Sequence, residues 1–246
     1  VVAQASDPRV TFSGQLANNC SEYQLSRALP DAPTYAYGLF RALWEEQGGS
    51  IGGQLRLGQV PAGRKPAVKF ESLPLAEVIR PVNKFSNNVM TRQIYLTLGA
   101  ERSGPPATLA SSRQALDATL KAAGLAMPEL IVDNGAGLSR TTRISARSLG
   151  RLLLHAANGP FRSEFEASLS IAGLDGTTRR RYRRDAMAGR MHLKTGTLNG
   201  VTSVAGYVRS ESGKEYVVVA ITNHSGPPYG GGLDAQQALL RWVYRR

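Results

Sequence analysis

The sequence has little from which to build a covalent cross-link or a membrane anchor. Its 246 residues include one cysteine, Cys20, which excludes a disulfide within the chain and any metal site made of several cysteines. The longest strongly apolar stretch, residues 216–221, has the length of a strand, well short of the roughly 20 residues that a membrane-spanning helix needs. The hydrophobic share of 42% and charged share of 20% are ordinary for a globular chain and argue against disorder or a coiled coil.

Acidic residues are scarce relative to basic ones. Lys and Arg number 30 against 18 Asp and Glu, which gives a formal net charge of +12. A surface of this charge attracts polyanions such as nucleic acid, anionic lipid headgroups or an acidic cell wall, and it does not distinguish among them. The chain also starts at Val1 with no signal peptide after it, so we expect a processed protein or a portion of a longer one.

Motifs of several common enzyme classes are also absent. The sequence has no His-Glu-x-x-His zinc-protease helix, no Gly-x4-Gly-Lys-Ser/Thr phosphate loop and no Gly-x-Gly-x-x-Gly dinucleotide fingerprint. The three histidines lack zinc-ligand spacing. His155 lies beside three leucines in a helical pattern, which favours a structural role.

Hydrophobic periodicity predicts helices first and an antiparallel meander afterwards. Asn199-Gly200 is a favoured two-residue hairpin turn, and Pro81 is expected to end or kink its helix. This order, closed by a last helix packed on the sheet, indicates an α+β fold rather than a βαβ series. The predicted helices cover residues 32–48, 75–79, 87–98, 108–123, 145–157 and 233–244, and the predicted strands cover 10–16, 130–132, 191–198, 201–209 and 215–222.

Two short motifs, far apart in the chain, carry the chemistry. Ser86-Asn87-Asn88 opens a helix, and Lys194-Thr195-Gly196-Thr197 lies on a strand before a hairpin. Either motif alone arises often by chance, but in this order and context they match two of the three signature elements of active-site-serine penicillin-recognising enzymes. We therefore predict that Ser86 lies in a cleft between a helical lobe, residues 75–159, and the sheet, within side-chain reach of Lys194.

The strand motif suits a substrate that ends in a free carboxylate. Such a substrate needs a cation and a hydroxyl donor, which Lys194 and Thr195 can supply. Gly196 has no side chain, so the substrate can lie along the strand edge. The backbone N–H of Thr197 then points to where an acyl oxyanion would develop.

The serine motif would complete this site. Ser86 offers a hydroxyl for proton relay, and Asn88 offers an amide that can hold the substrate's peptide group. The structural alternatives are that Ser86 is only a helix N-cap and that Lys194 is a solvated strand lysine. Position N3 after such a cap would be Val89, which forms no capping box.

From about residue 32 to the C-terminus, the sequence resembles the class C low-molecular-mass penicillin-binding proteins, the D-alanyl-D-alanine carboxypeptidase/endopeptidases of peptidase family S13. The middle of the three matching stretches looks like the family's Asp-Gly-Ser-Gly-Leu-Ser-Arg, with Asn134 and Ala136 as departures. Thr91-Arg92 stands where the family often has Ala-Glu. The stretches that carry the resemblance are residues 83–88, 133–140 and 189–201.

The resemblance implies a partial penicillin-binding protein/β-lactamase-like transpeptidase fold. Residues 1–28 would end an inserted β-rich domain, and residues 29–246 would form the C-terminal part of the catalytic domain. The implied activity is hydrolysis of D-Ala-D-Ala bonds or cross-links in peptidoglycan peptides through an acyl-serine, with β-lactams as inhibitors, no metal or organic cofactor, and a periplasmic or cell-wall location. The implied catalytic residues are Ser86, Asn88 and Lys194, and the implied substrate-binding residues are Thr195, Gly196 and Thr197.

The family's nucleophile element, Ser-x-x-Lys, is missing from these residues. No serine has a lysine three positions further on, and Ser6 is followed at that position by Arg9, which cannot lose its proton to act as a base. We expect that the chain is a C-terminal portion whose nucleophile lies upstream of Val1, so that it is inactive alone. The alternative is a non-catalytic module that binds peptidoglycan or β-lactams.

The basic run at residues 179–184 has the composition of a nucleic-acid contact, with five arginines around Tyr182. A solvated loop before the strand motif, or contact with peptidoglycan carboxylates, explains the run equally well, and we expect no specific nucleic acid partner. Cys20 is expected to be an inert, partly buried residue, or to pair with an upstream cysteine outside this chain.

Overall fold

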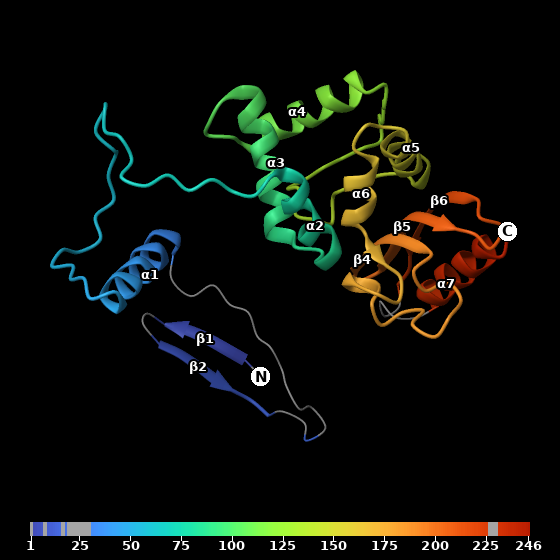
Figure 1. Cartoon of the computed structure of the whole chain (residues 1–246), viewed down its shortest axis with the longest axis horizontal. Coiled ribbons are helices and arrows are strands. Elements are labelled where there is room, and N and C mark those ends of the chain that lie inside the picture. The colour runs from blue at the N-terminus through green and yellow to red at the C-terminus, as the bar shows by residue number, and fades with distance from the viewer. Residues whose placement is uncertain (1, 7–8, 16–17, 19–30, 226–230) are drawn as a thin grey trace. The chain divides into compact units, whose positions relative to one another are not determined.

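The computed structural model describes residues 2–6, 9–15, 18, 31–225 and 231–246 (Figure 1). The chain divides into two compact units, Val1–Phe70 and Glu71–Arg246. The predicted domain boundary at residues 28/29, like Cys20, lies outside the described residues, and the domain assignment stays a prediction. No helix in the described part of the chain is both long and apolar enough to span a bilayer.

The described residues of the first unit form a hairpin and one helix. Strand β1 (Val2–Ser6) pairs antiparallel with β2 (Arg9–Ser13), the second overlapping the predicted strand. Helix α1 (Ala32–Glu46) begins after Asp31, whose carboxylate accepts a hydrogen bond from the Thr34 N–H at 2.8 Å. Residues 48–52 spell Gly-x-Ser-x-Gly, but they follow α1 in irregular backbone, without the strand and helix that make this pattern a nucleophile elbow.

The second unit begins with five helices, three of which have a small polar side chain capping their N-terminus. Asn87, Thr108 and Ser145 each accept a backbone N–H of the first turn that follows, and Thr108 forms a capping box with Ser111. These caps fix where α3, α4 and α5 start, whereas α2 and α6 have no side-chain cap. The five helices are α2 (Leu75–Phe85), α3 (Asn88–Ser103), α4 (Leu109–Ala122), α5 (Ala146–Ala157) and α6 (Arg162–Ser168).

A four-stranded antiparallel sheet forms the rest of the unit. Its order is β3 (Ser170–Ile171), β4 (Met191–Leu198), β5 (Val201–Arg209) and β6 (Glu215–Asn223). A short 3₁₀ helix, η1 (Gly176–Thr178), lies between β3 and β4, and α7 (Gly231–Tyr244) closes the chain. The predicted α+β fold is therefore confirmed, including the three-strand meander.

Alternating side chains of the sheet build two cores. On one face, α7 lies along the strands (Figure 1), and its Leu240 and Val243 pack on Met191, Val204 and Val208. On the other face, Leu153 of α5 and Leu169 pack on Tyr207, whose hydroxyl donates to the Leu153 carbonyl at 2.7 Å. The sheet is thus held between α7 and the α5–α6 side, which fixes the strand that carries the lysine motif.

Several local predictions were wrong. Pro81 neither ends its helix nor limits it to residues 75–79, since α2 runs to Phe85 with the proline inside. A proline removes one helical hydrogen bond. Beyond it, however, Val82 is buried and Lys84 donates to the Leu169 carbonyl, and these contacts hold the last turn of α2 in place. The predicted strand at residues 130–132 is a single bridge between Ile131 and Arg143.

Candidate active site

Ser86 lies in the tight joint between α2 and α3. Its φ of 56° and ψ of 50° place it in the left-handed region, where it ends α2, while the following Asn87 caps α3. The alternative of a simple N-cap role for Ser86 is therefore wrong. A residue with a Cβ in this conformation costs about 1–2 kcal/mol, and the joint turns the serine side chain toward β4.

Lys194 reaches across from β4 to this serine. Its Nζ donates to Ser86 Oγ at 2.8 Å and to its neighbour's carbonyl, Thr195 O, at 2.8 Å. The two residues lie 108 positions apart in the sequence, and their predicted proximity is confirmed. Burial lowers the pKa of Lys194 from its ordinary value, because the charged ammonium loses solvation there. The site thus raises the fraction of neutral lysine, the form that accepts a proton.

Asn88 follows Ser86 by two residues and faces the loop between α4 and α5. Its Nδ2 donates to the Ala136 carbonyl at 2.7 Å. Gly135, with φ of +71°, brings this loop so close to α3 that an added Cβ would lie 2.6 Å from the Tyr95 ring. One Asn88 hydrogen therefore orders the loop, and the amide oxygen remains able to accept a hydrogen bond from a substrate peptide N–H.

The strand motif presents its backbone and hydroxyls along β4. The hydroxyls of Thr195 and Thr177 lie 2.9 Å apart. An added Cβ at Gly196 would lie 2.5 Å from Ser203 Oγ on β5, so glycine avoids a close contact here even without a substrate. β3 pairs only with His192 and Leu193, so among the described strands none pairs with the other side of β4 from Lys194 onward.

Residues of these elements line a cleft of about 1050 Å³. Its lining includes every predicted site residue: Ser86, Asn88, Lys194, Thr195, Gly196 and Thr197. Sequence reasoning did not single out three further lining residues, Thr177, Arg140 and Arg143. Arg140 lies in the stretch that resembles the family and donates from Nη1 to the Asn199 carbonyl at 2.6 Å, which ties the loop to the β4–β5 hairpin.

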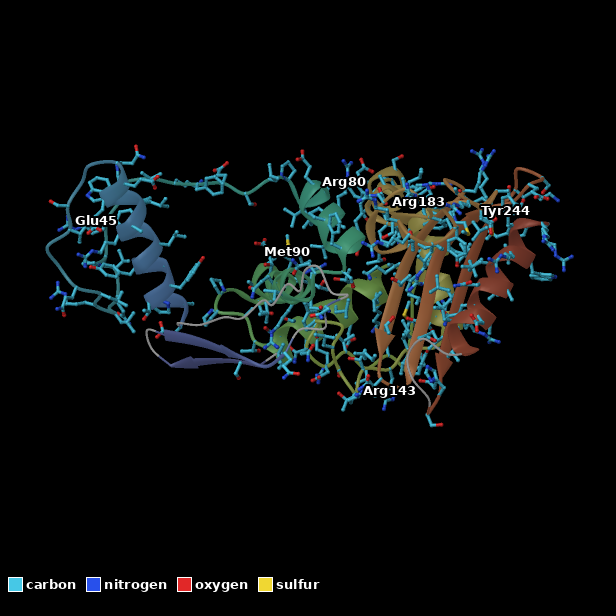
Figure 2. All side chains as sticks on the ribbon, turned by 90° about the horizontal axis from the view of Figure 1, so that it is seen from below. Glu45, Arg80, Met90, Arg143, Arg183 and Tyr244 are labelled. Carbon is cyan, nitrogen blue, oxygen red and sulfur yellow. The ribbon has the colours of Figure 1, made fainter. Side chains whose placement is uncertain are left out.

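The basic run, residues 179–184, lies away from the part of the cleft at the β4–β5 hairpin. Arg143, which lines the cleft, and Arg183, inside the run, lie toward opposite ends of the sheet strands (Figure 2). Arg179, Arg180 and Arg184 are also exposed, as expected of a solvated loop. Tyr182 is partly buried against the core, and burial raises its pKa. The only aromatic of the run is thus packed inward rather than offered to a nucleic-acid base.

Comparison with known proteins decides the family. Residues 1–243 match the sequence profile of the D-Ala-D-Ala carboxypeptidase 3 (S13) family. The chain belongs to this family. It is 29% identical over 226 residues to the D-alanyl-D-alanine carboxypeptidase of Actinomadura sp. (strain R39), a match that covers 89% of this chain and 42% of that protein. It is 31% identical over 185 residues to carboxypeptidase DacB of Mycolicibacterium smegmatis, covering 73% of this chain and 40% of the relative.

Solved structures confirm the predicted penicillin-binding protein fold. The S13 chain superposes on penicillin binding protein 4 (dacB) of Haemophilus influenzae with a TM-score of 0.79 at 21% identity, covering 89% of this chain and 50% of the other. A second structure of that protein, complexed with a novel β-lactam, gives a TM-score of 0.80 at 22% identity and covers 92% and 55%. The chain therefore spans about half or less of the length of these relatives.

Proposed function

We propose that the whole protein is a serine-type D-Ala-D-Ala carboxypeptidase/endopeptidase that acts on peptidoglycan peptides through an acyl-serine. These 246 residues would supply the serine-asparagine and lysine-threonine-glycine elements of its site. The observation that carries the proposal is the 2.8 Å hydrogen bond from Lys194 Nζ to Ser86 Oγ inside the cleft. No serine of this chain belongs to a Ser-x-x-Lys element, so we place the nucleophile in a part of the protein outside these residues and expect this chain alone to be inactive.

The chemistry divides among the residues as follows. The nucleophilic hydroxyl attacks the carbonyl of the penultimate D-Ala, an ester forms, and the terminal D-Ala leaves as a free amine after it accepts a proton. Ser86 and Lys194 are placed to relay that proton, and the lowered pKa of Lys194 favours the transfer. The N–H of Thr197 would stabilise the oxyanion, and Thr195 would hold the substrate's terminal carboxylate. Water then hydrolyses the ester.

Substrate, inhibitors and location follow from the same proposal. β-Lactams would acylate the same nucleophile, because their strained amide takes the place of the scissile peptide bond. A protein that acts on peptidoglycan works in the periplasm or at the cell wall, and the net charge of +12 favours contact with anionic wall polymers. The alternative function, a non-catalytic peptidoglycan- or β-lactam-binding module, rests on the absence of Ser-x-x-Lys from this chain.

Labelling of the full-length protein by a fluorescent penicillin tests the proposal. Lys194→Ala is expected to slow acylation by about 10²–10³-fold, the effect of removing one transition-state donor. Lys214→Ala is the matched control, because Lys214 is an exposed lysine in the β5–β6 turn and should leave the rate unchanged. A full-length Lys194→Ala protein that keeps the wild-type rate would overturn the role of this motif and favour the binding module.

The same label locates the nucleophile. The isolated 246-residue chain is expected to take up no covalent penicillin under conditions in which the full-length protein is labelled. Mass spectrometry of the labelled full-length protein should place the adduct on a serine outside this chain. An adduct on a serine within it would show that the nucleophile is present here.

A further inference from the structure

The two motifs of the cleft are tied together by residues 168–177, here called the bridge segment. At one end, the side chain of Asn83 donates from Nδ2 to Ser168 Oγ at 2.8 Å. Lys84 Nζ donates to the Leu169 carbonyl at 3.0 Å and pairs with the carboxylate of Asp175. The end of α2 that leads into Ser86 is therefore fastened to the bridge segment by two consecutive side chains.

The other end of the bridge segment reaches the strand motif through hydroxyl groups. Ser170 is fully buried, and its Oγ lies 3.2 Å from the Lys84 carbonyl, to which it donates. The same oxygen accepts the Thr177 N–H at 3.1 Å and lies 3.3 Å from Thr177 Oγ1. Thr177 Oγ1 in turn lies 2.9 Å from Thr195 Oγ1, at the wall of the cleft.

Each hydroxyl can donate one hydrogen, which limits the possible directions of these hydrogen bonds. The carbonyl of Lys84 can only accept, so it takes the hydrogen of Ser170. The hydrogen of Thr177 goes either to Ser170 at 3.3 Å, with Thr195 donating to Thr177, or to Thr195 at 2.9 Å. A carboxylate bound beside Thr195 favours the second arrangement, because Thr195 can then donate its own hydrogen to the carboxylate. When Thr177 donates to Thr195, the hydrogen of Thr195 is free to point into the cleft.

We propose that Thr177 is a positioning residue that donates to Thr195 Oγ1 and so turns the Thr195 hydroxyl toward the carboxylate of a bound peptide. The inference rests on the proposed function, because it assumes a ligand that ends in a carboxylate. A hydroxyl that accepts one hydrogen bond becomes a better donor, and a hydrogen bond to a carboxylate is stronger than one to a neutral group. Thr177 thus selects for a free C-terminus without touching it.

Equilibrium binding to the 246-residue chain tests this without any need for a nucleophile. NMR titration would compare an N-acylated peptide ending in D-Ala-D-Ala with the same peptide as its C-terminal amide. Thr177→Val keeps the shape of the side chain and removes the donor, and should weaken binding of the acid about tenfold while leaving the amide unchanged. Thr177→Ser keeps the hydroxyl and should stay within about twofold of the wild type. The tenfold loss corresponds to one net hydrogen bond of about 1.4 kcal/mol.

Two results would overturn the inference. One is that Thr177→Val weakens binding of the acid and of the amide alike, which would indicate a merely structural role. The other is a wild-type chain that does not prefer the acid. The outcome is separate from that of the proposed function: a full-length protein that resists acylation, combined with selective loss of acid binding in Thr177→Val, would refute the enzyme and leave the role of Thr177 standing.

Discussion

Gly176 offers the sharpest test of how the bridge segment packs against the serine motif. Its φ of +57° lies in the left-handed region, and an added Cβ would overlap Ser170 Oγ and lie 2.6 Å from the Lys84 carbonyl oxygen. The left-handed conformation costs a residue with a Cβ about 1–2 kcal/mol, and overpacking adds about 1–3 kcal/mol. Gly176→Ala should therefore lower the free energy of unfolding of the second unit by about 2–5 kcal/mol.

A second glycine separates the two contributions. Gly213 has φ of +82° with no atom within 4 Å of an added Cβ, so Gly213→Ala should show only the conformational cost of about 1–2 kcal/mol. Urea unfolding would be followed by fluorescence in a Trp44→Phe background, where Trp242 of α7 is the remaining tryptophan of two and reports the second unit. Equal destabilisation by the two alanines would refute the close packing of Gly176 on Lys84.

Two further predictions concern stability. Burial raises the pKa of Tyr207 to about 12, above the value of about 10 for an unfolded chain. The contribution of the neutral Tyr207 side chain to the free energy of unfolding is therefore intact below pH 10 and is lost as pH rises toward 12. Tyr207→Phe should flatten this alkaline loss of stability. It should also cost about 1 kcal/mol at pH 7, because the hydrogen bond to the Leu153 carbonyl is removed. If the free energy of unfolding, measured by urea titration across pH 9–12, declined as steeply in the variant as in the wild type, the prediction would be wrong. Ser145→Ala should remove the cap on the Ser148 N–H and cost about 1 kcal/mol, whereas Ser212→Ala, in an exposed turn, should cost less in the same urea assay.

The sequence was informative where chemistry needs particular residue types in a particular order. Ser86 and Lys194 could be placed in one cleft from two tripeptides, because the two in this order resemble two signature elements of penicillin-recognising enzymes. The meander was equally predictable, since Asn199-Gly200 specifies its first turn and apolar residues dominate the next strands. The helices predicted from apolar periodicity at residues 108–123 and 145–157 begin at the residues that cap α4 and α5, Thr108 and Ser145.

Other features had no local signal. Helix α6 has 7 residues and β3 has 2, too few for a hydrophobic period to show. Helix α6 packs through Phe165 on Tyr207 of the sheet, and β3 is set by its pairing with β4. Pro81 was expected to end or kink its helix, but tertiary contacts that begin at Val82, one residue later, keep the helix going to Phe85. Thr177 is one of two adjacent threonines, and only the fold shows which of them meets Thr195. Asn88 was expected to face substrate, but part of its hydrogen-bonding capacity holds the loop at Ala136.

The open side of β4 has a consequence for solubility. A strand edge with free N–H and C=O groups is a template for any extended chain, including another copy of the same protein. Here the open stretch begins at Lys194 and ends at Leu198, and a second surface, that of Ser86 and Asn88, lines the same cleft. The length is enough for a short peptide, while a lysine and a glycine in the stretch make it a poor seed for sheet growth. Under the proposed function, the residues that would bind the peptide are therefore also those that disfavour sheet growth.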